Sequence, residues 1–344
     1  MKTLFIRTGS KISEIRIGED RKNIGKLLPS ENLVIITDEN INNLYGDSFP
    51  NAPVIVIPAG EKSKNFRLVE KISKKILQLN LDRTGFILGI GGGVVCDIAG
   101  FVASIYLRGI NFGFISTSLL SQVDASVGGK NGINLGGAKN IIGNINQPEF
   151  VICDQSMLKT LPEDEYLSGL GELIKHAIIK DKKLLTLIRK DREKILHRDQ
   201  KVMEKLIGLS VQIKSEIVSL DEREGGVRRL LNFGHTFGHA IEVKYGFSHG
   251  MSVAIGMVMA SQFSFTRGMI TKAELEEVKE LLNSFSLLPQ AEISGRVIEK
   301  MLIHDKKRIG DSIHFVLLES IGNAVTDAVK IDEISDFLRN WRGM

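Results

Sequence analysis

In the first 155 residues, short runs rich in valine and isoleucine alternate with longer segments whose apolar residues recur at helical spacing. The runs predict strands at residues 33–37, 54–57, 86–90, 112–116 and 150–153, and residues 65–79 predict an amphipathic helix. Strands that alternate with helices favour parallel pairing, because each crossover helix returns the chain to the end of the sheet where it started. The first part of the chain is therefore expected to form a parallel sheet.

After residue 155 helical periodicity dominates. Helices are predicted at residues 163–179, 184–196, 202–220, 231–245, 251–265 and 271–285, and a late strand hairpin at 313–318 and 324–329. A chain of 344 residues exceeds the usual size of a single core. The predicted fold class is α/β, with a Rossmann-like parallel-sheet domain at 1–155 and a mainly α-helical domain at 156–344, facing each other across a ligand-binding cleft.

Composition narrows the class of protein. The net charge is only +4, and the lysines of residues 180–205 are interleaved with acids, which is typical of a solvated helix and not of a nucleic-acid surface. Cys96 and Cys153 lack C-x-x-C spacing, so neither a disulfide framework nor a zinc finger is supported. The apolar run 251–265 is shorter than the roughly 20 residues of a membrane span, and residues 1–13 are too charged for a signal peptide. We expect a cytoplasmic protein without membrane or nucleic-acid partners.

Three of the seven histidines lie between residues 228 and 250, in an otherwise apolar stretch. His235 and His239 are four residues apart, so a helix over 231–245 would place both on one face, within reach of a common metal ion. His249 follows a turn. The alternative is that these are core or capping histidines satisfied by backbone carbonyls.

A second dense region, residues 89–101, places a glycine-rich turn between a strand and a helix, as a phosphate-binding loop requires. It departs from G-x-G-x-x-G because Val94 stands where the third glycine would fall, and a tight turn is the alternative. Asp38 ends an earlier strand, where a carboxylate commonly holds a cofactor ribose. Further along, Glu172 and Lys175 share a helical face, which is weak evidence by itself.

Together these motifs resemble the 3-dehydroquinate synthase family, the NAD- and metal-dependent cyclases of the shikimate pathway. The resemblance runs from about Asp38 to Lys307 and rests on motifs in one order, at residues 58–64, 91–109, 121–130, 139–143, 171–175, 228–250 and 305–307. It implies that Glu172, His235 and His249 bind the metal, zinc or alternatively cobalt. The resemblance also makes His239 a substrate contact, so it replaces the interpretation from helical spacing that His235 and His239 bind the metal as a pair.

The resemblance assigns further residues. The expected NAD contacts are Asp38, Asn40, Glu61, Lys64, Gly92, Gly93, Val94, Asp97, Thr117, Ser118, Lys139 and Thr160. The expected substrate contacts are Asp124, Lys130, Asn140, Lys175, Lys214, Arg228, Asn232, His239 and Lys306, with Lys307 as the register alternative and Arg108 reaching from a neighbouring subunit of a homodimer.

Three residues depart from the family pattern. Ser118 replaces a threonine, Asn131 replaces a threonine, and Met251 stands where an acid is frequent beside the ligand His249. The first two exchanges keep a polar group. The third removes a charge that would tune the metal site.

The implied reaction is the conversion of 3-deoxy-D-arabino-heptulosonate 7-phosphate to 3-dehydroquinate and phosphate, a phosphate-eliminating lyase reaction in which NAD is reduced and reoxidised within one turnover. Lys214 and Arg228 are expected to hold the substrate carboxylate, although Arg228 has a surface ion pair with Glu222 or Glu224 as its alternative. The rival functions are another sugar-phosphate cyclase, a metal-dependent polyol dehydrogenase and a non-catalytic nucleotide-binding protein.

Overall fold

The computed structural model describes residues 1–9, 11–29, 31–303, 308–309, 312–341 and 343. The chain forms two compact units. The first comprises Met1–Pro162 and Met203–Arg223, and the second comprises Glu163–Val202 and Glu224–Met344. A single boundary at residue 155 does not describe the return of the chain to the first unit in the long helix α7 (Gln200–Leu220).

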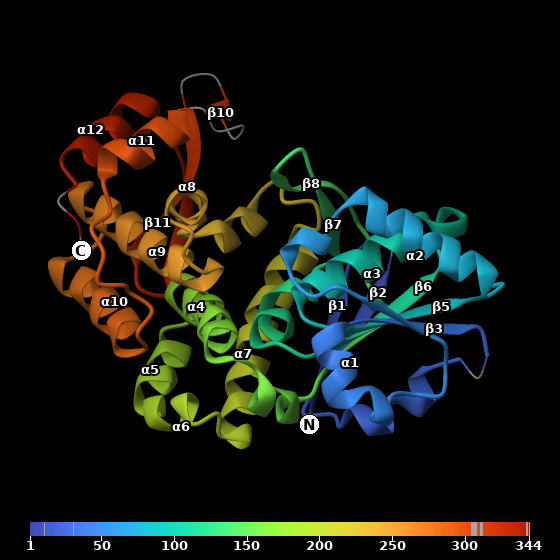
Figure 1. Cartoon of the computed structure of the whole chain (residues 1–344). Coiled ribbons are helices and arrows are strands. Elements are labelled where there is room, and N and C mark those ends of the chain that lie inside the picture. The colour runs from blue at the N-terminus through green and yellow to red at the C-terminus, as the bar shows by residue number, and fades with distance from the viewer. Residues whose placement is uncertain (10, 30, 304–307, 310–311, 342, 344) are drawn as a thin grey trace. The chain divides into compact units, whose positions relative to one another are not determined.

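The first unit is built on a seven-stranded sheet of order β1-β2-β9-β6-β5-β3-β4 (Figure 1). Its strands are β1 (Lys2–Arg7), β2 (Ile12–Ile17), β3 (Leu33–Asp38), β4 (Val54–Ile57), β5 (Phe86–Gly91), β6 (Asn111–Ser116) and β9 (Phe150–Cys153). All neighbours pair in parallel except β1 with β2. The five predicted strands are confirmed, and so is the α/β class. The β1–β2 hairpin was not predicted, because polar residues interrupt both runs.

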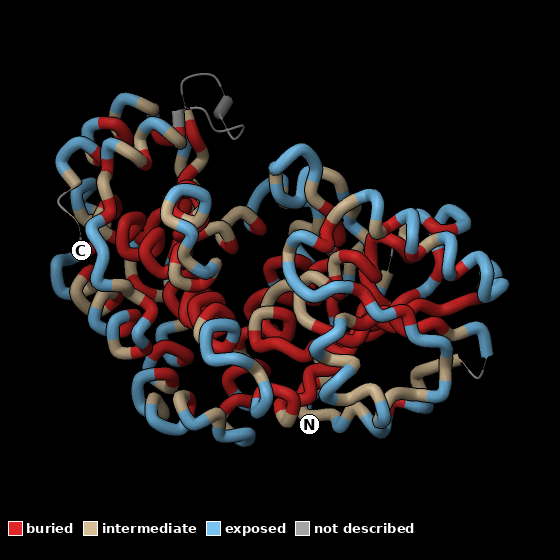
Figure 2. Tube along the Cα trace, viewed as in Figure 1, coloured by how far each residue is buried: buried red, intermediate tan, exposed pale blue. Residues whose placement is uncertain are grey.

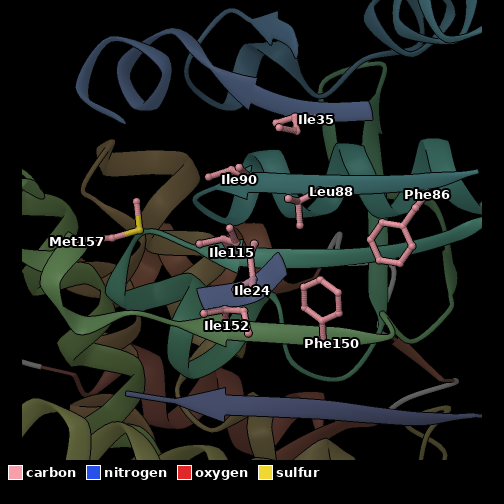
Figure 3. Close-up of a cluster of buried hydrophobic side chains, with 9 residues drawn as sticks. All are labelled: Ile24, Ile35, Phe86, Leu88, Ile90, Ile115, Phe150, Ile152 and Met157. Carbon is pink, nitrogen blue, oxygen red and sulfur yellow. The ribbon is translucent and has the colours of Figure 1, made fainter. Parts of the chain in front are cut away.

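The core of this sheet is aliphatic with an aromatic pair (Figure 3). Leu88 and Ile90 of β5 point into the cluster with Ile35 of β3, and each has no exposed surface. The rings of Phe86 and Phe150 stack with centroids 5.7 Å apart. Continuous burial along β5 is typical of a parallel strand covered on both faces, and Figure 2 shows these strands as buried along their length.

Helices and one hairpin surround the sheet. The helices of the first unit are η1 (Arg21–Leu27), α1 (Glu39–Tyr45), η2 (Gly46–Ser48), η3 (Glu61–Ser63), α2 (Phe66–Gln78), α3 (Gly93–Ile105), η4 (Tyr106–Arg108), η5 (Ser121–Ala125), η6 (Gln155–Thr160) and α7. The hairpin consists of β7 (Lys130–Leu135) and β8 (Ala138–Ile145) and packs on α3. Asn131 of β7 approaches Gly100 so closely that a β-carbon there would lie 1.9 Å from its amide oxygen.

The second unit is mainly helical, as predicted. Its elements are α4 (Glu163–Lys180), α5 (Lys182–Lys190), α6 (Arg192–Leu196), η7 (Val227–Asn232), α8 (His235–Tyr245), α9 (His249–Thr266), α10 (Lys272–Ser284), α11 (Gly295–Ile303), β10 (Arg308–Ile309), β11 (Ser312–Ser320), β12 (Asn323–Lys330) and α12 (Ile331–Arg339). The predicted hairpin is the antiparallel pair β11–β12.

Two predicted helices need correction. The helix expected at 184–196 is divided at Asp191, whose φ of −99° and ψ of 19° are not helical. The helix expected at 231–245 begins only at His235, because Gly234 adopts a left-handed φ of 78° and separates α8 from the 3-10 turn η7. Residues 227–232 and His235 therefore do not share one continuous helix.

In the part of the chain that the structure describes, no helix is both long and apolar enough to cross a bilayer.

Candidate active site

Four parallel strands of the first unit end at one edge of the sheet, and predicted cofactor contacts follow each end. Asp38 closes β3, Gly92 and Gly93 follow β5, and Thr117 follows β6. Thr160 lies at the end of η6, which follows β9. The carboxyl edge of a parallel sheet is where such folds bind nucleotides. The structure therefore brings residues from four separate segments to one edge.

The glycine-rich turn is shaped for close approach. A β-carbon at Gly91 would lie 2.4 Å from the side chain of Val95, and one at Gly93 would lie 3.1 Å from Ala125. Gly92 is the N-cap residue of α3, and it has no side chain that could cap the helix. The amide groups of the first turn of α3 have no partner within the helix, so they are suited to bind the diphosphate of a dinucleotide. These residues fit the diphosphate of a dinucleotide, and their contact with NAD stays a prediction.

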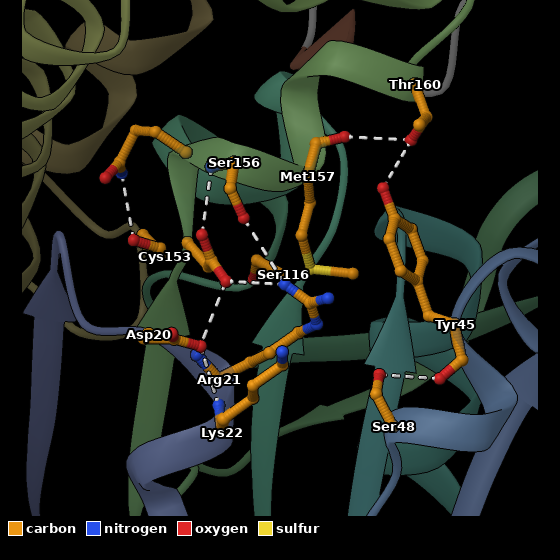
Figure 4. A network of polar contacts seen from close by, with 12 residues as sticks. Asp20, Arg21, Lys22, Tyr45, Ser48, Ser116, Cys153, Ser156, Met157 and Thr160 are labelled. Carbon is orange, nitrogen blue, oxygen red and sulfur yellow. Dashed lines mark hydrogen bonds and ion pairs between the residues drawn. The ribbon is translucent and has the colours of Figure 1, made fainter.

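A polar network fixes the neighbouring segment η6 (Figure 4). The guanidinium of Arg21 donates to the carboxylate of Asp154 over 3.0 Å and lies 4.8 Å from the ring centre of Tyr45. The hydroxyl groups of Tyr45 and Thr160 are 2.5 Å apart. Arg21 and Tyr45 thus hold the segment that carries the predicted cofactor contact Thr160. Sequence reasoning did not select either residue, since neither belongs to a motif.

Lys64 forms a second network in the first unit. Its ammonium lies 2.5 Å from Oδ2 of Asp97 and 3.8 Å from Oε1 of Glu61, and it also donates to the amide oxygen of Asn140. Burial raises the pKa of Asp97 to about 6, against the lowering effect of Lys64 and with a further increase from Glu61 and Asp124. Three predicted NAD contacts and one predicted substrate contact therefore meet around one buried ammonium.

The remaining predicted residues of the first unit differ in their surroundings. Lys214 of α7 donates to the backbone oxygen of Asp124 over 2.6 Å and to its carboxylate over 2.5 Å. Ser118 is buried and exchanges hydrogen bonds with Ser121, so the hydroxyl that replaces threonine is used. Arg108 is exposed and has a left-handed φ of 70°. The roles predicted for Asn40, Val94, Lys130 and Lys139 stay predictions.

In the second unit, backbone contacts between helices position the predicted metal ligands. A β-carbon at Gly171 of α4 would lie 3.1 Å from the backbone oxygen of Gly250 in α9. Gly171 immediately precedes Glu172, and Gly250 immediately follows His249. The absence of side chains at this crossing lets the two helices approach closely enough to bring the carboxylate and the imidazole together.

Glu172, His235 and His249 form a compact cluster whose ligand atoms all lie within 4.8 Å of one another. Oε1 of Glu172 is 3.6 Å from Nε2 of His235 and 3.5 Å from Nε2 of His249. Zinc bonds of about 2.0–2.1 Å at tetrahedral angles would separate ligand atoms by roughly 3.3 Å. Glu172 has no exposed surface, and among the described residues its carboxylate is paired with the ammonium of Lys175. The donor set and spacing fit a divalent metal ion.

Charges around the cluster keep the carboxylate ionised. Burial alone would raise the pKa of Glu172, but the ion pair with Lys175 and the nearby His235 and His249 hold it well below its usual value. Burial and the charge of Lys175 lower the pKa of His235 well below 6.5, which leaves a neutral imidazole. Burial also acts to lower the pKa of His249, but hydrogen bonds to Glu172 and Glu242 outweigh it and raise the pKa to about 9.

The other ring nitrogens of the two imidazoles have orienting partners. Nδ1 of His249 is 3.2 Å from Oε2 of Glu242, and Nδ1 of His235 is 3.2 Å from the backbone oxygen of Phe233. Such contacts turn Nε2 toward the cluster. Glu242 thus supplies a carboxylate beside His249 even though Met251 occupies the position of the frequent acid. Sequence reasoning noted Glu242 in the histidine block but gave it no role.

Two family models match the chain, that of the 3-dehydroquinate synthase N-terminal domain at residues 54–168 and that of its C-terminal domain at residues 169–308. A curated 3-dehydroquinate synthase from Bacillus pumilus is 38% identical over 360 aligned positions, which cover 99% of this chain and 98% of the relative. The chain belongs to the 3-dehydroquinate synthase family. This confirms the resemblance that the sequence motifs indicated.

Solved structures agree with the fold of a 3-dehydroquinate synthase family member. The 2-epi-5-epi-valiolone synthase of Streptomyces hygroscopicus, solved with NAD⁺ and Zn²⁺ bound, has 25% identity and a TM-score of 0.86 over 98% of both chains. A 2-deoxy-scyllo-inosose synthase solved with carbaglucose-6-phosphate, NAD⁺ and Co²⁺ has 24% identity and a TM-score of 0.87 over the whole of both chains. The second likeness shows the shared fold alone.

Arg228 requires a correction to the sequence argument. Arg228 is only 2% exposed, so it does not lie at the surface, and its pairing with Glu222 or Glu224 stays an open alternative. It lies in η7 and not on the helix of His235, so the argument that two helical turns join them is wrong. In the same turn, the amide of Asn232 donates to the carboxylate of Glu224. Lys214 belongs to the first unit and Arg228 to the second, so their joint role stays a prediction.

His239 lies beside the cluster, with its ring centre 5.2 Å from that of His235 and 6.4 Å from that of His249. Its predicted contact with substrate is compatible with this position. Lys306 and its register alternative Lys307 lie outside the described residues.

Proposed function

We propose that this chain catalyses the NAD- and metal-dependent conversion of 3-deoxy-D-arabino-heptulosonate 7-phosphate to 3-dehydroquinate and inorganic phosphate. Membership of the family supports the reaction. The observation that carries the assignment of the site is the Glu172–His235–His249 cluster, in which a fully buried carboxylate and two imidazoles place their ligand atoms at metal-binding spacing.

When bound, NAD⁺ would supply reversible hydride transfer at a ring alcohol, and a divalent ion held by Glu172, His235 and His249 would supply charge stabilisation at the oxygen of that alcohol. The protein's own residues bind, orient and balance charge. Lys175 keeps Glu172 ionised, Glu242 orients His249, and the amide groups at the start of α3 bind phosphate. The ketone formed at that carbon would acidify the adjacent C–H bond and allow phosphate to leave. After the hydride is returned to the ketone, the sugar ring opens and an intramolecular aldol reaction closes the carbocycle. The substrate phosphate is suited to accept the proton, so no dedicated base is assigned.

The predicted substrate contacts favour an acidic sugar phosphate. Arg228 is a buried cation in the unit that carries the Glu172–His235–His249 cluster, which supports a role for it in binding an anionic group. Its fork is suited to a substrate carboxylate. A neutral polyol would have no use for this cation together with Lys130 and Lys214. The family resemblance also supports a cytoplasmic homodimer, with Arg108 reaching the neighbouring site.

The deciding experiment is a phosphate-release assay with the acidic seven-carbon sugar phosphate, a divalent metal and NAD at catalytic concentration. Phosphate should accumulate without matching absorbance from NADH. Stoichiometric NADH production would support a polyol dehydrogenase instead. The Arg228→Ala variant should lose about 2–5 kcal/mol of transition-state stabilisation on the acid substrate. An equal small loss on a ketose phosphate without the acid group would support another cyclase.

A further inference from the structure

Asn134 joins the segments that carry several predicted cofactor and substrate contacts, although no motif includes it in that role. Its backbone N–H donates to the backbone oxygen of Lys64 over 2.8 Å. Its side-chain amide donates to Oε1 of Glu61 over 2.8 Å, and its side-chain oxygen accepts from the backbone N–H of Asn140 over 2.8 Å. One residue thus bonds to three residues in two segments, to Glu61 and Lys64 in one and to Asn140 in the other.

The register of the β7–β8 hairpin explains why the side chain of Asn134, and not a backbone oxygen, accepts from the N–H of Asn140. Ile133 pairs with Ile142, and Leu135 pairs with Ala138, so Asn134 alone lies opposite residues 139–141. The ladder cannot continue through such a bulge, and Asn140 adopts a left-handed φ of 52° within it. Its N–H therefore has no place in a regular ladder. The amide oxygen of Asn134 takes the place of the missing backbone acceptor.

The position of Asn140 matters because its side-chain oxygen accepts from Lys64. The Lys64 side chain is only 4% exposed, and its ammonium also pairs with Asp97 of α3. The same Asn134 amide group holds Glu61 on the other side of this ammonium. Loss of the Asn134 side chain would release both Glu61 and Asn140 while leaving Lys64 and Asp97 in place.

We propose that Asn134 is a positioning residue that sets the affinity for the dinucleotide by holding Glu61 and Asn140 around Lys64. The proposal rests on the proposed function, because it takes Glu61, Lys64 and Asp97 to contact NAD. Asn134 itself touches no reacting group. Its loss should therefore weaken NAD binding more than it slows turnover at saturating NAD.

The test measures the NAD dissociation constant of the full-length protein by titration calorimetry. Asn134→Ala should raise it about tenfold, the effect of roughly one hydrogen bond to a charged group, while kcat at saturating NAD stays within about threefold. Asn144→Ala is the matched control, because Asn144 lies on β8 of the same hairpin and its amide oxygen has no hydrogen bond among the described residues. An equal increase in the control, or less than about twofold in Asn134→Ala, overturns the proposal.

A reversed pair provides a rescue. Asn134→Asp keeps the acceptor for Asn140 but places a carboxylate against Glu61, so it should weaken NAD binding about tenfold in the parent. In the Glu61→Gln background the new aspartate can accept from the glutamine amide, and the same change should cost less than about threefold. Equal effects in both backgrounds overturn the proposal.

Amide hydrogen exchange separates this inference from the proposed function. The N–H of Asn140 should exchange at least about tenfold faster in Asn134→Ala than in the parent, whether or not NAD binds. Unchanged exchange overturns the positioning role. Failure of the parent to bind NAD would instead overturn the proposed function.

Discussion

Each unit of this chain buries a lysine beside a carboxylate, yet the two carboxyl groups shift in opposite directions. In the first unit, burial raises the pKa of Asp97 to about 6, because the lowering effect of Lys64 does not outweigh burial and Glu61 and Asp124 add negative charge. In the second, Lys175, His235 and His249 outweigh burial and hold the pKa of Glu172 well below its usual value. The number of surrounding cations, and not burial alone, decides the charge of a buried acid.

This difference matches the two proposed tasks. A metal ligand must stay deprotonated, and Glu172 does so because the ammonium of Lys175 pairs with it and the two imidazoles lie beside it. Asp97 shares the ammonium of Lys64 with Asn140. The proposed NAD contact of Lys64 would add the cofactor as a further partner. A weakly held proton on Asp97 suits a site whose partners change.

The largest effect is expected for Glu172→Gln. Loss of a residue that orients a metal ligand typically reduces metal affinity by roughly 10–100-fold. Loss of the charged ligand itself should reduce metal affinity further, and turnover should fall with the metal content. The ammonium of Lys175 would also lose its buried counter-charge, at about 3–5 kcal/mol of unfolding free energy. Metal content by mass spectrometry and chemical denaturation measure the two effects. Full metal retention would remove Glu172 from the site.

Glu242→Gln should have an intermediate effect. The variant keeps all three proposed ligands but weakens the contact that orients His249, so metal affinity should fall about 10–100-fold. A competition titration with a chelator measures the affinity. Unchanged affinity would show that Met251 costs the site nothing and that Glu242 does not replace the frequent acid.

The pH dependence of stability should distinguish the two pairs by sign. For Asp97, whose pKa rises from 3.8 to about 6, the stabilising protonated form is present below about pH 4 and is lost as pH rises to 6. Asp97→Asn removes this loss, so its unfolding free energy relative to the parent should increase by on the order of 2–3 kcal/mol between pH 4 and 6.

Glu172 should behave in the opposite way in metal-free protein. Its lowered pKa gives stability that is present above the usual value of 4.5 and is lost as pH falls through the folded-state value. Glu172→Gln should therefore lose stability relative to the parent as pH rises through 4.5. Denaturation in the presence of a chelator at several pH values tests both variants. Slopes of the same sign would contradict the comparison.

The smallest effect is expected for a helix cap, and this variant serves as a control for the site variants. Thr271 and Glu274 form a capping box at the start of α10, away from both buried pairs. Thr271→Ala should cost about 1 kcal/mol of unfolding free energy and leave metal and NAD affinity unchanged. A change in either affinity would mean that general loss of stability, and not local charge, explains the site variants.

Local patterns predicted most of the secondary structure. The apolar runs 54–57 and 150–153 match β4 and β9 at both ends. β9 is buried throughout, as expected of a strand covered on both faces, whereas Val54 and Val56 of the edge strand β4 are exposed. Predictions failed where one residue's backbone angles decide the outcome. Gly234 and Asp191 each divide a segment whose apolar spacing is helical throughout.

The sequence by itself determined the two-part α/β organisation, the glycine-rich turn and the family, because these depend on local periodicity and on ordered motifs. Only the tertiary structure decided which groups meet. Spacing paired His235 with His239, whereas the close crossing of α4 and α9 at Gly171 and Gly250 brings Glu172 to His249. The contacts of Glu242 and Asn134 likewise arise from packing and from a bulge in a hairpin. Asn134 meets Glu61 across 73 residues, and the shorter separations from Glu242 to His249 and from Asn134 to Asn140 depend on a turn and a bulge that periodicity does not predict.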